Sequence, residues 1–235
     1  MALDPYNADH RARGTILLAN APFGGDELYH ELYVRQVGDE EANVRASGLR
    51  GLGLHGRPED VGLILPQLED EIPAVRLEAV RALQRIHNPE AIDALIISTR
   101  LPDPTEEAGR TGEPEPMIRG EAAFALGQYA EPRVVQPLIA ALADRFLVVN
   151  ESARRSLRTL TGQDFGFDRR AWLEWYRDTE TPFAGRGEYV YPTFRRGKFW
   201  WEYLPFVPGP PNETPAPPVG LTPAAPVTSE NVLPG

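Results

Sequence analysis

The sequence predicts an all-α fold: a right-handed α-solenoid of about five helix pairs, followed by an irregular extension rich in aromatic residues and then in proline. Three observations predict this fold. One pattern of apolar and small residues recurs along the chain at a nearly constant spacing. Prolines recur in register with that pattern, at Pro58, Pro89 and Pro132. The helical periodicity then stops after Asp178.

The first helix of each pair is predicted in the segments that begin at Asn43, Ala74, Met117 and Val148, which lie 31, 43 and 31 residues apart. Apolar and small residues recur there at steps of three and four, which makes one face of an amphipathic helix. The small residues let a neighbouring helix approach closely. The recurring positions are Val44, Val75, Ile118 and Val149; Arg45, Arg76, Arg119 and Asn150; Gly48, Ala79, Ala122 and Ala153; Gly51, Ala82, Ala125 and Ser156; and Leu52, Leu83, Leu126 and Leu157.

The second helix of each pair is predicted to begin at one of the repeated prolines, because proline fits the first turn of a helix. Each such pair cannot bury both of its faces alone, so its neighbours in a stack complete the core. The apolar residues of the predicted second helices are Val61, Leu65 and Leu68; Ile92, Leu95 and Ile96; and Val135, Leu138, Ile139 and Leu142.

The pattern weakens at the N-terminal end of the array, as it does in terminal repeats that have one side in water. Residues 1–38 are expected to form a degenerate helix pair, and residues 39–162 to hold the repeats proper. The longer step of 43 residues places an insertion within residues 98–116. Because this segment is rich in proline and acidic residues, it should be an irregular acidic loop. It is either a part of the binding side or a tolerated loop without function.

The pairs Val44-Arg45, Val75-Arg76 and Ile118-Arg119, each followed by a small-residue helix and a Pro-led second helix, resemble HEAT-like repeats. The type is the short one also seen in phycobilin lyases. The resemblance covers residues 9–162 and concerns the fold, because this scaffold serves many unrelated partners. It implies that Arg45, Arg76 and Arg119 bond to loop acids or carbonyls of the adjacent repeat, as a structural ladder rather than a ligand site.

A Trp-rich capping helix is predicted within residues 163–181. Gly162 can take the left-handed conformation that ends a helix, and Asp168 can cap the next one. Trp172 and Trp175 then share one helix face and can seal the last repeat. The segments LTGQDFGFD and WLEW in this region resemble the end motif of HEAT-repeat proteins common in planctomycete-type bacteria, many of them predicted envelope lipoproteins.

The composition excludes several classes of function. The net charge of −10 argues against a nucleic-acid binder, which needs positive surface potential. No apolar run is long enough for a transmembrane segment. The absence of cysteine excludes disulfides, thiol catalysis and cysteine-bound metals. The four histidines are His10, His30, His55 and His87, and they show no metal-binding spacing. We therefore expect no catalytic residues, no cofactor and no metal, and a protein that is not an enzyme.

Residues 182–235 are predicted to form an irregular tail. Its first part carries eight aromatic residues, namely Tyr189, Tyr191, Phe194, Phe199, Trp200, Trp201, Tyr203 and Phe206. These side chains either fold back over the solenoid as a cover, or they dock a partner or a membrane interface through Phe199, Trp200, Trp201 and Tyr203. The part from Pro208 to Gly235 buries too little apolar surface to fold and should be extended or disordered.

The function predicted from this sequence is a non-catalytic scaffold or adaptor for protein partners, or an accessory subunit of a larger assembly. We expect the second helices to line the concave face of the solenoid. Their outward side chains are expected to bind a partner protein that has a basic patch. These side chains are Glu59, Asp60, Gln67, Glu90, Asp93, Arg133 and Gln136. The alternative is a bilin lyase or a chaperone-type subunit of tetrapyrrole attachment.

The sequence leaves the location of the protein open. The segment that begins at Met1 lacks the pattern of a secretory signal. The protein is therefore cytoplasmic, or it belongs to the periplasm or cell envelope, with peripheral association, if a leader was removed.

Overall fold

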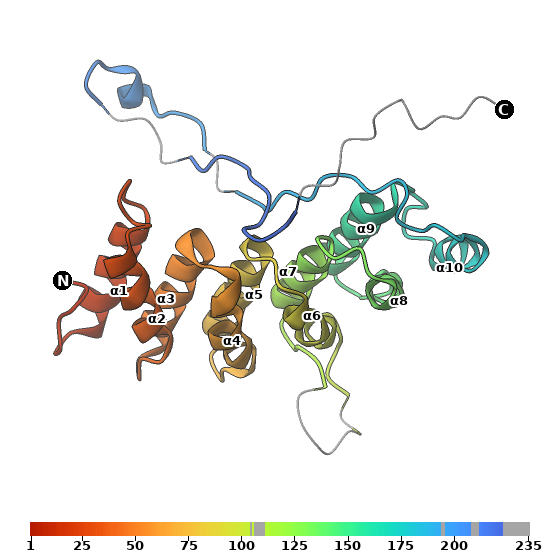
Figure 1. Cartoon of the computed structure of the whole chain (residues 1–235), viewed down its shortest axis with the longest axis horizontal. Helices are drawn as coiled ribbons and strands as arrows, with labels where there is room; N and C mark the ends of the chain where they lie inside the picture. The colour runs from red at the N-terminus through yellow and green to blue at the C-terminus, as the bar shows by residue number, and fades with distance from the viewer. Residues whose placement is uncertain (104, 106–110, 194–195, 208–211, 223–235) are drawn as a thin grey trace.

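The computed structural model describes residues 1–103, 105, 111–193, 196–207 and 212–222. Within these ranges the chain forms ten α-helices packed as successive pairs, which confirms the predicted all-α solenoid. The first helices of the pairs form one row and the second helices a parallel row beside it (Figure 1). The first helices are α1 (Ala8–Ala19), α3 (Ala42–His55), α5 (Pro73–Arg85), α7 (Pro116–Leu126) and α9 (Leu147–Thr161).

The second helices are less regular than the first. They are α2 (Glu27–Val37), α4 (Val61–Ile64), α6 (Ile92–Ser98), α8 (Pro132–Ala141) and α10 (Arg169–Asp178). The repeated prolines begin these segments: Pro58 and Pro89 open short 3-10 turns before α4 and α6, and Pro132 opens α8. Helix α4 is a single turn that passes into another 3-10 turn at Leu65–Glu69, where Pro66 cannot donate an α-helical hydrogen bond.

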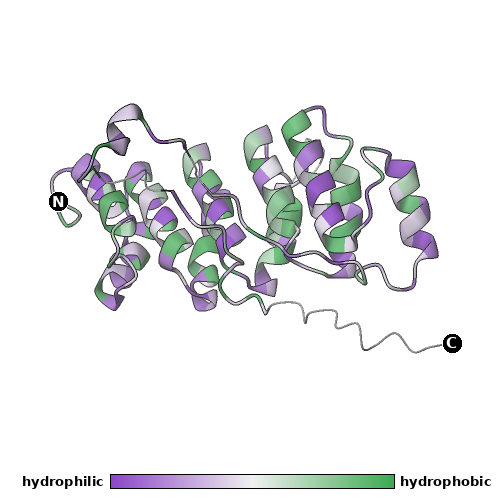
Figure 2. Cartoon of the chain, turned by 90° about the horizontal axis from the view of Figure 1, so that it is seen from above, coloured by the Kyte–Doolittle hydropathy of each residue, from purple (hydrophilic) through white to green (hydrophobic). Residues whose placement is uncertain are grey.

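The core lies between the two rows and follows the recurring positions of the sequence. Leu52, Leu83 and Leu126 are fully buried, as are Val44 and Val75. The helices carry hydrophobic and hydrophilic residues side by side, as expected of helices that bury one face (Figure 2). Each first helix packs mainly on the first helix of the next pair, with small residues at the contact.

The last repeat is sealed by α10. Trp172 is fully buried and forms edge-to-face contacts with Phe165 and Trp175. Gly162 ends α9 with a positive φ of 72°, and the Asp168 carboxylate accepts hydrogen bonds from the first backbone N–H groups of α10. Of the described helices, none combines the length and the apolar character that crossing a membrane requires.

After α10 the chain turns back and crosses the side of the first helices (Figure 1). Residues 212–222, which belong to the segment predicted to be extended or disordered, lie against the helices. Val219 forms a parallel β-bridge with Ile86, and Pro218 is buried. Backbone hydrogen bonds hold this segment in place, although it contains few large apolar side chains. Residues 104, 106–110, 194–195, 208–211 and 223–235 lie outside the described residues, together with the predictions made for them.

Candidate interaction surfaces

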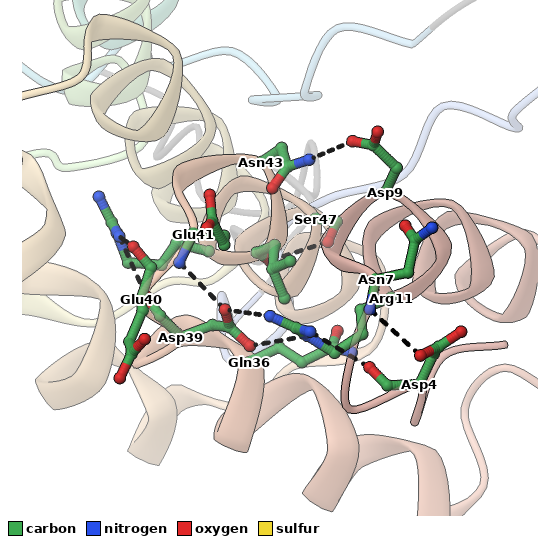
Figure 3. A network of polar contacts seen from close by, with 12 residues as sticks. Asp4, Asn7, Asp9, Arg11, Gln36, Asp39, Glu40, Glu41, Asn43 and Ser47 are labelled. Carbon is green, nitrogen blue, oxygen red and sulfur yellow. Dashed lines mark hydrogen bonds and ion pairs between the residues drawn. The ribbon is translucent and has the colours of Figure 1, made fainter.

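A row of arginines joins the loops between successive repeats, and we call it the arginine ladder. Each guanidinium donates a pair of hydrogen bonds to a carboxylate in the loop before the next first helix. The pairs are Arg11 with Asp39, Arg45 with Asp70, Arg76 with Glu113 and Arg119 with Asp144, all with N–O distances of 2.7–3.2 Å. The first pair is seen in Figure 3, where Arg11 lies between Asp39 and the Asp4 carbonyl.

The remaining nitrogen of each guanidinium binds backbone carbonyls of the loop before its own helix. Arg45 Nη1, for example, donates to the carbonyls of Asp39 and Glu40 at 3.0 and 2.8 Å. In the last pair Asn150 replaces arginine and donates to the carbonyl of Asp144 at 2.9 Å. The carboxylate and the carbonyl of one loop residue therefore bind two consecutive members of the ladder. This arrangement leaves the guanidiniums occupied by the protein itself.

The charged groups of the arginine ladder are buried in pairs. Arg119 is fully buried, and its partner Asp144 is nearly so. Burial by itself raises the pKa of Asp144, but hydrogen bonds from Arg119 and from the Phe146 N–H outweigh it, so the pKa lies below its ordinary value. The same balance lowers the pKa of Asp39 and of Asp70. Paired and hydrogen-bonded in this way, the buried charges are satisfied.

Sequence reasoning found the arginines but missed the acids that bind them. Each acid stands six residues before the next member of the ladder, as Asp39 does before Arg45. Glu113 keeps this spacing to Arg119 although it belongs to the insertion. Its side chain is fully buried, so the end of the acidic loop is a structural part of the repeat array. An acid at a fixed offset from a repeated arginine is the signal that could have found these residues.

The second-helix face holds the polar residues that the sequence singled out. Glu59, Glu90, Asp93, Arg133 and Gln136 are exposed, and Gln67 is half-buried. The side chains of Asp93 and Arg133 form an ion pair of 2.9 Å between α6 and α8.

The prediction that Asp60 points outward is wrong. It is 6% exposed, with one carboxylate oxygen 2.8 Å from His30 Nε2 and 2.7 Å from the Arg57 N–H. A polar residue among apolar positions can be a buried hydrogen-bonded group as readily as an exposed one, and Asp60 holds the start of the second helix.

Two further histidines, His55 and His87, are also used in packing. His55 Nε2 lies 2.7 Å from the carbonyl of Ala19, and His87 stacks on Tyr129. Burial lowers the pKa of His87. Across the described ranges, no three His, Asp or Glu side chains stand close enough together to hold a metal ion.

One part of the aromatic tail covers the helices, and another part is exposed. Tyr189 is buried against Phe124, and Tyr191 lies under the guanidinium of Arg85. The Arg186 side chain donates to the Gln128 carbonyl at 2.9 Å. The start of the tail therefore covers the C-terminal ends of α5 and α7.

Residues 196–207, which we call the aromatic lobe, stand away from the helices (Figure 1). Phe199 stacks on Trp201 at a centroid distance of 4.5 Å, and Trp200 meets Trp201 edge to face. Trp200 and Tyr203 are 76% and 74% exposed. The lobe is not loose, because Arg196 binds both oxygens of Glu202, at 2.6 and 2.7 Å.

The neck of the lobe is closed by two reciprocal hydrogen bonds between Arg196 and Asn212, with donor–acceptor distances of 2.9 and 3.1 Å. In the first, the Arg196 backbone N–H donates to the Asn212 side-chain oxygen. In the second, the Asn212 side-chain nitrogen donates to the Arg196 carbonyl. The lobe is thus an ordered loop that presents large aromatic rings to water.

Two stretches of the chain match known repeats in sequence. Residues 32–110 match HEAT repeats, and residues 118–144 match the PBS lyase HEAT-like repeat. No protein of curated function matches the chain.

Several solved structures align with this chain. An engineered protein aligns with a TM-score of 0.51 and 18% identity, over 79% of this chain and 95% of its own. YibA of Escherichia coli aligns with a TM-score of 0.49 and 17% identity, over 76% of this chain and 66% of its own. A designed armadillo repeat protein, solved with the peptide (KR)4, aligns with a TM-score of 0.49 and 16% identity, over 75% of this chain and 84% of its own. At such identities the likeness concerns the fold alone.

Proposed function

Because this chain carries HEAT repeats, we propose that it is a non-catalytic scaffold or adaptor for other proteins, and that it serves as an accessory subunit of a larger assembly. The aromatic lobe is the observation that carries the proposal. Phe199, Trp200, Trp201 and Tyr203 form an ordered cluster in contact with water, although their burial would be favourable. Trp and Tyr are enriched among the residues that dominate the energy of protein interfaces.

The second-helix face supplies the other contact surface. Glu59, Glu90 and Asp93 are exposed along it, and Gln67, Arg133 and Gln136 add hydrogen-bonding groups. The chain as a whole has a net charge of −10. A partner with a basic patch fits this face, because complementary charge speeds encounter and favours the correct partner.

The lobe is tested by comparing two double variants of the full chain as bait, with bound proteins quantified by mass spectrometry. Trp200→Ala with Tyr203→Ala should reduce the retention of a specific partner at least tenfold, because dominant interface residues contribute about 2 kcal/mol or more each. Tyr6→Ala with Phe23→Ala is the matched control, since both side chains are exposed aromatics outside the lobe. Equal retention by the lobe variant and the wild type contradicts the proposal.

The acidic face is tested with the partner that this comparison identifies. Its affinity should fall as salt rises from about 0.05 to about 1 M, because ions screen exposed charges. Glu59→Lys with Glu90→Lys should weaken binding at low salt and have little effect at high salt. An affinity that does not change with salt shows that the acidic face is not the contact surface.

A further inference from the structure

Residues 212–222 lie on the helices as a bound peptide would. The Val219 N–H donates to the carbonyl of Arg85 at 2.8 Å, and the His87 N–H donates to the carbonyl of Val219 at 2.8 Å. Pro218 is buried beside this bridge, and Gly220 passes Pro58 and the His87 carbonyl with a φ of +87°, so closely that a Cβ would collide with both. The chain beyond α5 therefore offers a backbone edge to an extended segment, which is a common mode of peptide recognition.

A charged cavity adjoins this edge. It has a volume of about 290 Å³ and lies on the first-helix face, between α3, α5 and α7. We call it the arginine groove, because Arg50, Arg81 and Arg85 line it, together with Glu78 and Glu121. The carboxylate of Glu213 enters it from the docked segment and binds Arg85 Nη2 at 2.6 Å.

The charges of the groove favour an acidic occupant. Arg81 forms ion pairs with both Glu78 and Glu121, at nitrogen–oxygen distances of 3.0 and 3.4 Å. Arg50 is exposed and forms no ion pair in the part of the chain that the structure describes. When Glu213 leaves, three guanidiniums face two carboxylates, which makes a local positive site on a chain whose net charge is −10.

We propose that the arginine groove and the backbone of residues 85–87 form a binding site for an extended, proline-containing acidic peptide of a partner protein. Residues 212–222 occupy this site as a ligand from the same chain, and a partner segment of the same chemistry displaces them. The docked segment defines that chemistry: a carboxylate on Arg85, a buried proline, and a backbone bridge six residues after the carboxylate.

An occupant from the same chain has a predictable effect. A segment tethered to its own site has an effective concentration of about 1 mM. If the site binds this segment with a dissociation constant of about 0.1 mM, a peptide of a partner protein would bind the occupied site about tenfold more weakly than the free site. The site lies on a different face from the acidic second helices and does not include the lobe. The outcome therefore does not decide the scaffold function proposed above.

The test is the binding of a fluorescein-labelled peptide with the sequence of residues 212–222, NETPAPPVGLT, followed by fluorescence anisotropy. The full chain with Glu213→Lys and Val219→Pro loses the ion pair and the bridging N–H, so its own segment is released. This variant should bind the peptide about tenfold more tightly than the wild type. The same peptide with lysine in place of its glutamate should bind at least tenfold more weakly.

The matched control is Thr214→Lys with Thr222→Pro. It introduces the same residue types into the same segment, at exposed side chains without hydrogen bonds among the described residues, and it should bind the peptide as the wild type does. Equal binding by the released variant and the wild type overturns the proposal. Dimers that exchange their tails and exclude the peptide overturn it as well, since the occupant would then be a second copy of the chain.

The unaltered protein provides a second measurement. Excess unlabelled peptide should displace residues 212–222 of the wild type and increase hydrogen exchange at Val219 of the chain, whose N–H donates to the Arg85 carbonyl in the docked segment, while the bound peptide continues to protect the His87 N–H. The lysine-containing peptide should cause no increase at the same concentration. If both peptides leave the exchange unchanged while the labelled peptide remains bound, the peptide binds elsewhere and the proposed site is wrong.

Discussion

Each arginine of the ladder makes two kinds of contact that no other residue type can make together. The flat guanidinium fork binds both oxygens of a carboxylate, and the remaining nitrogen reaches backbone carbonyls, one in Arg11 and two in Arg45, Arg76 and Arg119. Lysine would keep the charge but lose this geometry. The ladder therefore fixes the loops of neighbouring repeats relative to each other, in addition to the apolar packing between helices.

Arg119 should be the most sensitive member, because it is fully buried. Arg119→Ala removes the donor of the Glu113 and Pro114 carbonyls and leaves the Asp144 carboxylate with only the Phe146 N–H. We expect the free energy of unfolding to fall by about 3–5 kcal/mol, and Arg119→Lys to recover only a part of that loss. Urea denaturation followed by circular dichroism measures both changes.

The control for this prediction is Arg133→Ala, which breaks the exposed ion pair with Asp93. Its effect should stay below about 1 kcal/mol, as is usual for surface ion pairs. Similar losses at Arg119 and Arg133 would show that the ladder contributes no more to stability than surface charge does.

Between helices, the close approach depends on small residues at particular positions. A Cβ added at Gly51 of α3 would lie 2.5 Å from the Tyr33 ring of α2, which is itself fully buried. Such a contact forces the ring or the helix to move. Gly62 in α4 differs, because a Cβ there would meet no atom within 4 Å.

Gly51→Ala should therefore lower the free energy of unfolding by about 1–3 kcal/mol, since overpacking outweighs the better helix propensity of alanine. Gly62→Ala should have the opposite effect, a gain of up to about 1 kcal/mol. Thermal and urea denaturation of the two variants give the comparison. A stabilised Gly51→Ala variant would mean that α2 and α3 are not packed as closely as described.

The first helices could be predicted from the sequence because their buried residues recur at fixed offsets, as Leu52, Leu83 and Leu126 do. The second helices could be placed by their prolines, but the single turn of α4 could not, since spacing does not distinguish an α-helical turn from a 3-10 turn. Asp60 was misassigned because polarity alone does not report whether a partner such as His30 covers the group.

The way in which the tail docks on the helices could not be predicted, because its contacts carry little side-chain information. The bridge between Ile86 and Val219 uses backbone groups that every residue except proline possesses, and it joins positions far apart in the sequence. Composition indicated that eight aromatics would not remain without a role, but it could not assign Tyr189 to the cover and Trp200 to the exposed lobe.

The whole molecule is a linear array, so each repeat depends mainly on its two neighbours. The contact between α5 and α7 is less extensive than those between α3 and α5 or between α7 and α9. The insertion enters the array at this point. Polar contacts cross it, among them those of Arg76 with Glu113, of Gln84 and Arg81 with Glu121, and of the Gln128 side chain with the Leu83 carbonyl. Coupling between the two halves of the array thus depends strongly on polar groups.

Glu113→Ala should uncouple these halves, because it leaves the buried guanidinium of Arg76 without its carboxylate. We expect α3 and α9 to lose hydrogen-exchange protection together in the wild type as urea rises, and at different urea concentrations in the variant. Glu90→Ala, which removes an exposed acid, should leave the two losses coincident. If Glu113→Ala lowers the midpoint but keeps both helices in one transition, the remaining contacts between α5 and α7 are sufficient to couple the array, and Glu113 is not required for the coupling.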